Sequence, residues 1–252
     1  MSANSNKQRH SATPLRVVTY NVHKCRGFDR RTAPGRIISV LRELDADIFC
    51  LQEVVNAPDQ APLFDQAGAI ARAFPDHTAC FGANRPLRGG TYGNLTLSRL
   101  PVLAWKNVDI TRKREPRGVL RTDLSLGPEK TLHVFNVHLG TGIMERKYQA
   151  RRLMSDDILL DPDLHGCRLV LGDFNEWTKG LTTRLLRESF QTFPPRHALR
   201  FPKTFPGMLP FTTLDHCYYE PPLELLETRL WRSRIALVAS DHLPLLAELQ
   251  LP

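Results

Sequence analysis

Residues 167–175 read Cys-Arg-Leu-Val-Leu-Gly-Asp-Phe-Asn, a mostly apolar run that ends in a carboxylate and an amide. The first five residues predict a β-strand, because they are rich in branched side chains and are followed by glycine. A nearly continuous apolar run is typical of a strand buried on both faces. We therefore expect Asp173 and Asn175 at the end of a buried strand.

The same pattern occurs twice nearer the N-terminus. Residues 15–20 lead to Asn21, and residues 47–51 lead to Gln52 and Glu53. Both runs are short, rich in β-branched or aromatic residues, and flanked by Asp, Gly or Pro, which predicts strands rather than helices. Polar groups at several strand ends suggest one shared site.

The polar residues at these ends are suited to a hard divalent cation. Mg²⁺ prefers oxygen ligands and usually takes one or two protein carboxylates together with water and substrate phosphate. The candidate oxygen donors are Asn21, Glu53, Asp173, Asn175 and Asp241. A zinc site has little support, because the five cysteines form no CxxC pair and no HExxH is present. The pattern predicts a divalent-metal phosphohydrolase.

Seven segments, taken in order, resemble the motif series of the endonuclease/exonuclease/phosphatase superfamily. They are 19–23 (TYNVH), 51–54 (LQEV), 93–99 (GNLTLSR), 136–139 (NVHL), 172–175 (GDFN), 214–216 (LDH) and 240–244 (SDHLP). That superfamily includes DNase I-like nucleases, abasic-site endonucleases, neutral sphingomyelinases and inositol polyphosphate 5-phosphatases. One tetrapeptide is weak evidence, but the whole series in order is strong.

The resemblance implies a role for each matching residue. Asn21 and Glu53 match metal ligands of the family, and Asp241 matches a carboxylate at the metal cluster. Asp173 and Asn175 match the pair that positions the attacking water and a phosphate oxygen. We therefore expect Mg²⁺ as the cofactor, with Mn²⁺ as an alternative.

The resemblance also implies groups that contact the substrate. His242 matches an imidazole on the scissile phosphate, Asp215 the carboxylate that orients it, and His138 a second phosphate-contacting histidine. Asn94 matches a residue that approaches the phosphate or sugar. A carboxylate beside His242 would favour its protonated form, so we expect this imidazole to act as an electrophilic clamp.

Basic residues are concentrated in two segments, and each contains one predicted phosphate ligand, Arg117 or Arg146. The two segments comprise Arg112, Lys113, Arg114, Arg117 and Arg121, and then Arg146, Lys147, Arg151 and Arg152. The formal net charge of +8 favours a polyanionic partner without naming it. Nucleic acid and an anionic lipid surface would both attract such residues. A solvated helix face is an equally ordinary reading of the second segment.

Each candidate also has an ordinary structural interpretation. Asp173 and Asn175 could cap a helix expected to begin near Trp177, since Asp and Asn are common N-caps. Residues 240–242 could form a simple turn, and His138 alone would more often be a structural histidine. Their coincidence in the order of the family argues against seven separate accidents.

The expected fold class is α/β (α+β), and the resemblance implies a four-layer α/β/β/α sandwich that is DNase I-like. Amphipathic helices are predicted over 34–44, 61–74 and 144–159. We expect residues 14–252 to form a single domain, because no Gly/Ser-rich linker or repeat interrupts them. Residues 1–13 are expected to be a disordered polar tail.

Location and assembly follow from simpler features. The polar tail lacks the apolar core of a secretory signal, and no apolar stretch approaches the roughly 18–20 residues needed to span a bilayer. An odd number of scattered cysteines favours reduced thiols. We expect a cytoplasmic protein without stable membrane insertion, and we expect it to be a monomer.

The function predicted from these features is Mg²⁺-dependent hydrolysis of a phosphodiester by activated water, most consistent with a nuclease. The alternatives are a phospholipid-headgroup phosphodiesterase and a small-molecule phosphatase. The N-terminal motif, 19–27, looks more like a bacterial branch of the superfamily than like abasic endonucleases. A catalytically inactive binding module would require a broken motif, and none is evident. The Pro/Phe-rich stretch 193–211 is expected to form a loop beside the site.

Overall fold

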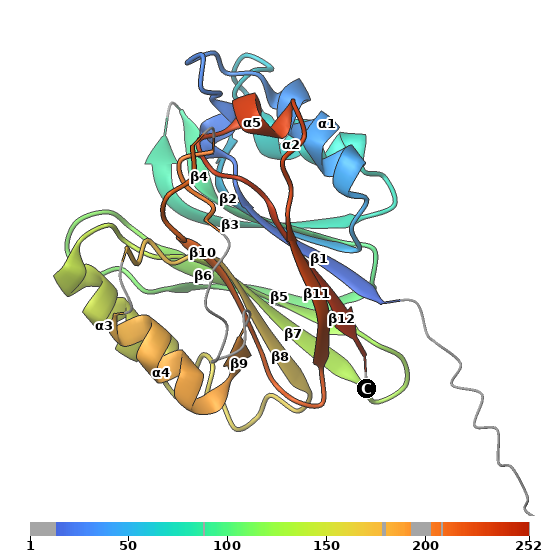
Figure 1. Ribbon diagram of the computed structural model, residues 1–252, viewed down its shortest axis with the longest axis vertical. Coiled ribbons are helices and arrows are strands. Elements are labelled where there is room, and N and C mark those ends of the chain that lie inside the picture. Colours follow the sequence, from blue (N-terminus) through green and yellow to red (C-terminus); the bar gives the residue numbers. More distant parts are fainter. Residues whose placement is uncertain (1–13, 88, 178–179, 193–202, 208, 252) are drawn as a thin grey trace, which may run out of the picture.

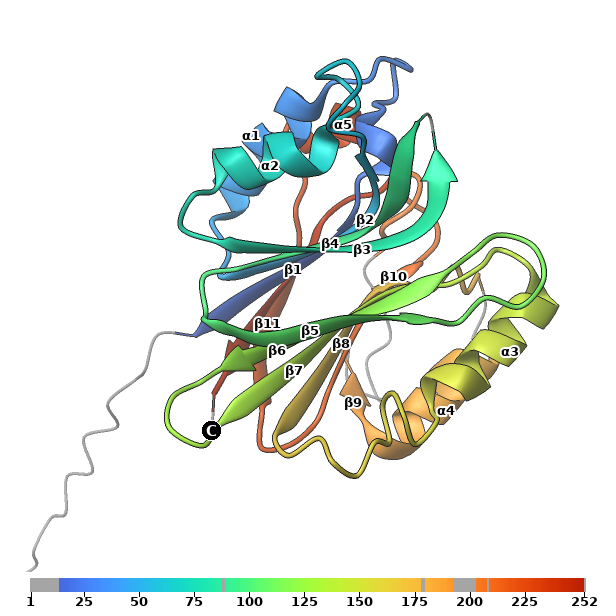
Figure 2. The same ribbon diagram turned by 180° about the vertical axis from the view of Figure 1, so that it is seen from behind.

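The computed structural model describes residues 14–87, 89–177, 180–192, 203–207 and 209–251. Two six-stranded sheets face each other, with helices on their outer faces (Figure 1, Figure 2). The predicted polar tail and much of the Pro/Phe-rich stretch lie outside the described residues. No helix in the described ranges is both long and apolar enough to cross a membrane.

The first sheet has the strand order β11-β12-β1-β2-β4-β3 and the second β5-β6-β7-β8-β10-β9. The strands of the first sheet are β1 (Leu15–Asn21), β2 (Ile48–Asn56), β3 (Thr78–Leu87), β4 (Gly90–Ser98), β11 (Glu224–Leu230) and β12 (Leu245–Gln250). Those of the second are β5 (Val102–Asp109), β6 (Gly118–Ser125), β7 (Thr131–His138), β8 (Cys167–Asp173), β9 (Gln191–Thr192) and β10 (Asp215–Tyr219). The helices are α1 (Pro34–Leu44), α2 (Gln66–Ala73), α3 (Ile143–Leu153), α4 (Leu181–Ser189) and α5 (Ala236–Ala239), with a short 3₁₀ helix at His23–Cys25.

Apolar layers between the elements hold this arrangement together. Helices α1, α2 and α5 cover the first sheet, where Ile37 packs in one cluster with Phe49. Val17 and Leu169 belong to the cluster between the two sheets. Helices α3 and α4 cover the second sheet, with Leu186 in a third cluster. The order of layers is therefore α/β/β/α, which confirms the expected fold class.

The directions of the central strands bring the ends that carry the polar residues to one edge of the two sheets. β1 pairs with β2 and β7 pairs with β8 in parallel, whereas β12 and β10 run antiparallel to β1 and β8. Consequently the last residues of the parallel strands and the first residues of β10 and β12 lie at one edge. The register places Asp173 opposite both His138 and Asp215.

The predicted helices are present, although two of their boundaries were wrong. The helix expected over 34–44 is α1, which has these bounds. The helix expected over 61–74 begins only after Asp65, because this carboxylate caps it by accepting a backbone hydrogen bond. The helix expected over 144–159 ends at Leu153, and turns follow it.

Three buried amide side chains, Asn136, Gln52 and Asn94, join the two sheets; we call them the interlayer amide cluster. Asn136 on β7 donates to the backbone carbonyls of Leu51 and Leu95 in the first sheet, each at 3.1 Å. Its Oδ1 accepts from Gln52 Nε2 at 2.9 Å, and Asn94 Nδ2 donates to the Asn136 carbonyl at 3.1 Å. All three side chains are fully buried, so water cannot replace a lost partner.

We predict that Asn136→Leu lowers the free energy of unfolding by about 3 kcal/mol, because several buried polar groups lose their partner at once. Chemical denaturation measures this change. Asn107→Leu is the matched control, since Asn107 also joins the sheets, through the Ala83 carbonyl at 2.9 Å, but at a partly exposed position. Equal losses in the two variants would contradict a special role for the buried cluster.

His216 on β10 is a buried imidazole in an aromatic setting. Its ring lies edge-on to Phe174 and stacks on Tyr218, with ring centroids 5.5 and 5.9 Å away. Burial lowers the pKa of His216 to about 4, although the neighbouring carboxylate of Asp215 opposes this change. His216 is therefore neutral in the folded protein at neutral pH.

We predict that His216 makes the protein less stable in mild acid. Between pH 6.5 and pH 4 the unfolded state binds a proton at this residue and the folded state does not, so stability falls as the pH decreases. The full loss is about 3 kcal/mol. Denaturation measured across this pH range should show a shallower dependence in His216→Phe. The matched control is the same substitution at His165, an exposed position.

Candidate active site

Side chains from both sheets surround the carboxylate of Asp173. Asn21 Nδ2, from the end of β1, donates to Asp173 Oδ2 at 2.9 Å. The same oxygen lies 3.6 Å from His138 Nε2 and 3.7 Å from His242 Nε2. Asp173 is 1% exposed, so these polar groups replace water around its carboxylate. The fold thus brings three predicted site residues, Asn21, His138 and His242, around the carboxylate of a fourth.

Local backbone geometry fixes the position of Asp173. The preceding residue, Gly172, has a φ of +151°, and a Cβ there would lie 1.8 Å from the Val137 carbonyl oxygen. On the other side, the Asn175 backbone N–H donates to Asp173 Oδ1 at 2.8 Å, while Asn175 itself has a φ of 48°. Asn175 Nδ2 donates to the Leu139 carbonyl at 2.9 Å. The loop after β8 is therefore tied to the end of β7.

His242 forms a charged pair with Asp215. Their Nδ1 and Oδ2 atoms are 2.9 Å apart, and both side chains are buried. Burial alone would lower the pKa of His242, but the carboxylates of Asp215 and Asp173 raise it to about 10. Burial in turn raises the pKa of Asp173 to about 6, against the attraction of His242. At neutral pH an imidazolium therefore faces the Asp173 carboxylate.

His138 has the opposite electrostatic character. Arg117 Nη1 lies 2.9 Å from its Nδ1 and 3.2 Å from its Nε2, and a guanidinium can only donate hydrogen bonds. Burial and the charge of Arg117 hold the pKa of His138 well below its usual range. A neutral imidazole accepts from Arg117 through one ring nitrogen and carries its proton on the other. Arg117 is itself held by Glu115 at 2.6 Å.

Glu53 projects from an irregularity in β2. The pairing of β2 with β4 shifts register between Leu51 and Val54, and Glu53 has a φ of 60°. Its carboxylate contacts Lys24 Nζ and lies 3.4 Å from Asn21 Nδ2. Burial opposes ionisation, but the basic side chains around it lower the pKa of Glu53 to about 2. Glu53 is therefore an ionised carboxylate at the edge of the site.

The oxygen donors at this edge fit a hard cation with few protein ligands. Asn21 and Glu53 are in contact, whereas Asp241 contacts His23, whose Nδ1 is 3.4 Å from Asp241 Oδ1. Asn21 Oδ1 accepts from the His23 backbone N–H at 3.0 Å and retains a second lone pair. Within the described part of the chain, no three His, Cys, Asp or Glu side chains cluster closely enough to hold a metal. The donor set suits Mg²⁺, which commonly takes one or two protein carboxylates.

Two predicted substrate ligands bond to backbone carbonyls. Asn94 is fully buried and donates to the carbonyls of Gly118 and Asn136, although its Oδ1 has no hydrogen-bond partner among the described residues. Arg146 donates to the carbonyls of Gly140 and Thr141 in the loop before α3. Their expected contacts with substrate stay predictions.

Several residues of the site were not identified from the sequence. Lys24 contacts Glu53, and Glu115 holds Arg117, but isolated charged residues in loops give no sequence signal for either contact. The helix expected near Trp177 begins at Leu181, and its capping group is Glu176. This carboxylate accepts from the backbone N–H groups of Thr182 and Thr183 at 3.2 and 3.0 Å, so Asp173 and Asn175 do not cap α4.

An aromatic wall adjoins His242. The ring centroid of Phe205 lies 5.0 Å from that of His242 and 5.8 Å from that of Trp177. Phe211 lies 6.4 Å from Trp177. Trp177 and Phe211 are 51% and 59% exposed, so the wall presents apolar surface to whatever occupies the site.

Comparisons with known proteins identify the family of this chain. The Endonuclease/Exonuclease/phosphatase family matches residues 18–242. The protein YbhP of Escherichia coli K12 is 32% identical over 260 residues, covering 94% of this chain and 96% of YbhP. The chain therefore belongs to the endonuclease/exonuclease/phosphatase family, whose members are hydrolases that act on phosphate esters.

Solved structures of low identity share the fold. An endonuclease/exonuclease/phosphatase from Beutenbergia cavernae has a TM-score of 0.73 and 22% identity, covering 95% of this chain and 72% of that one. A mannosyl-6-phosphatase from Bacteroides thetaiotaomicron has a TM-score of 0.73 and 17% identity, covering 94% of this chain and 100% of that one. At these identities the likeness shows the fold alone.

We predict that Gly172→Ala destabilises the protein by about 3 kcal/mol or more, since it adds both a strained φ and a clash with the β7 backbone. The control is Gly35→Ala in α1, where a Cβ meets nothing within 4 Å. This variant should be more stable by about 0.5 kcal/mol, because alanine restricts the unfolded chain. Urea denaturation of both variants measures the difference. Similar stabilities would contradict the close strand approach at Asp173.

Proposed function

We propose that the protein is a Mg²⁺-dependent phosphodiesterase that cleaves its substrate with an activated water, and that its substrate is nucleic acid. The observation that carries this proposal is the meeting of Asn21, His138 and His242 at the buried carboxylate of Asp173. Water-dependent cleavage of a phosphodiester needs an oriented nucleophile and positive charge at the phosphoryl oxygens. The site offers both within one cluster.

Asp173 is the proposed group that orients and deprotonates the water. Its pKa of about 6 leaves the carboxylate ionised at neutral pH while keeping it basic enough to accept a proton. Asn175 supports this role, because its backbone N–H fixes Asp173 Oδ1 and its side chain is anchored to Leu139. These two bonds would hold the Asp173 carboxylate in one orientation toward the water.

The histidines and Arg117 are proposed to hold the phosphate. His242 brings a positive charge, stabilised by Asp215, and Arg117 brings a second one. The neutral His138 offers an N–H without adding charge. Mg²⁺ held at Asn21 and Glu53, with Asp241 nearby, would neutralise charge on the phosphoryl and leaving oxygens.

Nucleic acid is favoured as the substrate by the net charge of +8 and the basic segments around the site. A small-molecule phosphatase is the second candidate. The half-exposed wall of Trp177 and Phe211 beside His242 would suit a compact substrate with an apolar or flat face. The shared fold with a mannosyl-6-phosphatase is compatible with that alternative. A phospholipid headgroup is a third candidate of the same chemistry.

We also propose that the enzyme works as a monomer in the cytoplasm. All five cysteines are buried free thiols. A reducing compartment keeps such thiols unpaired. Sedimentation and cell fractionation would test the two parts of this proposal separately.

We predict that Asp173→Asn lowers kcat for bis-p-nitrophenyl phosphate by about a thousandfold, because the water loses its base. EDTA should abolish the wild-type activity, and Mg²⁺ or Mn²⁺ should restore it. The matched control is Asp157→Asn, which changes an exposed carboxylate paired with Arg152. Its activity should equal that of the wild type.

A substrate panel separates the candidates. Single-stranded DNA, RNA, mannose 6-phosphate and phosphatidylglycerol vesicles are incubated with wild type and Asp173→Asn. Turnover of sugar phosphate alone would replace the nuclease proposal with the phosphatase. Metal-independent hydrolysis, or an Asp173→Asn variant with full activity, would overturn the mechanism itself.

A further inference from the structure

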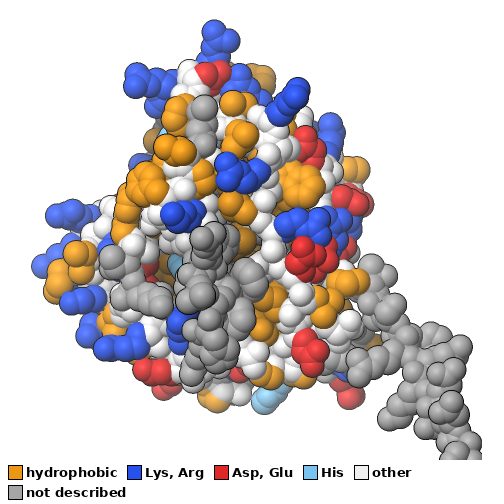
Figure 3. Space-filling model, in the orientation of Figure 1, with side chains coloured by type: hydrophobic (Ala, Val, Ile, Leu, Met, Phe, Trp, Pro, Cys, Tyr) orange, Lys and Arg blue, Asp and Glu red, His pale blue; other side chains and the backbone are white. Residues whose placement is uncertain are grey.

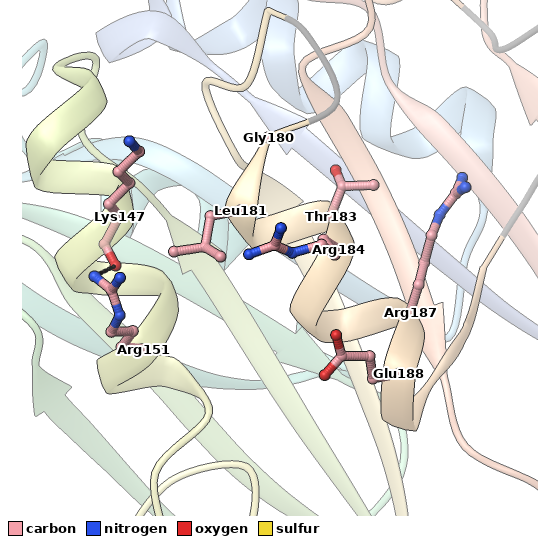
Figure 4. Close-up of a pocket in the computed structure, with 8 residues that line it drawn as sticks. All are labelled: Lys147, Arg151, Gly180, Leu181, Thr183, Arg184, Arg187 and Glu188. Carbon is pink, nitrogen blue, oxygen red and sulfur yellow. Dashed lines mark hydrogen bonds between the residues drawn. The ribbon is translucent and has the colours of Figure 1, made fainter.

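A basic groove lies between α3 and α4 on the outer face of the second sheet. It has a volume of about 980 Å³, and four cationic side chains line it: Lys147, Arg151, Arg184 and Arg187. Glu188 is the acidic side chain among the lining residues. Figure 4 shows Lys147 and Arg151 on one wall and the residues of α4 on the other. Figure 3 shows Lys and Arg side chains gathered at the edge of the molecule where α3 lies.

Three of the four cations in this groove have no acidic partner in the described part of the chain. Lys147, Arg151 and Arg184 make no ion pair with any other residue in the described ranges, and all three are exposed. Arg151 Nη1 donates instead to the Lys147 backbone carbonyl at 3.3 Å. Like charges gathered in a recess raise the local positive potential and attract an anion.

The two helices that line the groove follow the strands that end at the candidate site. α3 follows β7, which ends at His138, and α4 follows β8, which ends at Asp173. Both helices run back from that edge along the second sheet (Figure 1). Lys147 and Arg151 are four residues apart on α3 and therefore face the same side, about 6 Å apart along the axis. The cations therefore lie on two helices that lead away from the ends of β7 and β8.

We propose that this groove binds backbone phosphates of a single nucleic-acid strand that extends beyond the cleaved bond. Helices α3 and α4 contact each other, and the recess between them can admit a single strand. The broad surface of a bilayer would touch only the rims of this recess. The inference rests on the proposed phosphodiesterase activity and names the class of its substrate. The groove acts on affinity, and the chemistry stays at Asp173.

The test uses the full-length double variant Lys147→Gln/Arg184→Gln. Its dissociation constant for a fluorescent single-stranded 12-nucleotide DNA should rise about tenfold. The slope of log K against log salt should fall by about 1.4, or about 0.7 for each lost phosphate contact. The control, Arg42→Gln/Arg232→Gln, removes the same charge from exposed positions on the layer of the other sheet and should keep wild-type affinity.

Hydrolysis distinguishes this inference from the proposed function. The groove variant should cleave bis-p-nitrophenyl phosphate with wild-type kcat/KM, while KM for the oligonucleotide rises about tenfold. If neither substrate is hydrolysed by the wild type but the groove variant binds DNA less well, the proposed function fails and the groove is upheld.

Two outcomes would overturn the inference. The first is an equal effect of the groove and control variants on DNA binding, which would show general charge attraction. The second is unchanged DNA binding with lost binding to phosphatidylglycerol vesicles, which would assign the groove to an anionic lipid surface. Thermal unfolding of both variants verifies that the folds are equivalent.

Discussion

The contact between the two sheets through buried amides is the constraint on which the rest of the structure depends. Asn136 in the second sheet donates to backbone carbonyls of the first sheet. Gln52 on β2 in turn donates to the side-chain oxygen of Asn136. Hydrophobic packing alone would allow the sheets to slide, whereas amides without access to water hold one register. Gln52 directly precedes Glu53, and Asn136 lies two residues before His138. The cluster that aligns the layers therefore also aligns the residues of the candidate site.

This alignment places two imidazoles of different protonation state beside the carboxylate of Asp173. The two imidazoles that approach it at 3.6 and 3.7 Å differ in protonation, because one is paired with Asp215 and the other faces Arg117. A single buried carboxylate thus lies between an imidazolium and a neutral imidazole. This asymmetry requires burial, since water would screen the charges that create it.

Much of the fold could be predicted because its central strands are apolar runs and its motifs follow them directly. β11 was not predicted, because its exposed, charged residues lack the pattern of a buried strand. The start of α4 was misplaced because its cap, Glu176, lies several residues before the helix and across a turn. The contact of Lys24 with Glu53 joins a loop to a strand bulge. The spacing of residues in the sequence encodes neither the cap of α4 nor the contact of Lys24 with Glu53.

By itself, the sequence determined the class of protein, the central strands and the residue types available to a phosphate-ester site. It did so because strand ends and their polar residues are local features, written in consecutive positions. Only the tertiary structure decided which of these residues meet at Asp173, which histidine is charged, and that Asn94 and Arg146 bond to backbone carbonyls. The physical reason is that protonation and contact depend on burial and on neighbours from distant strands, which the sheet topology brings together.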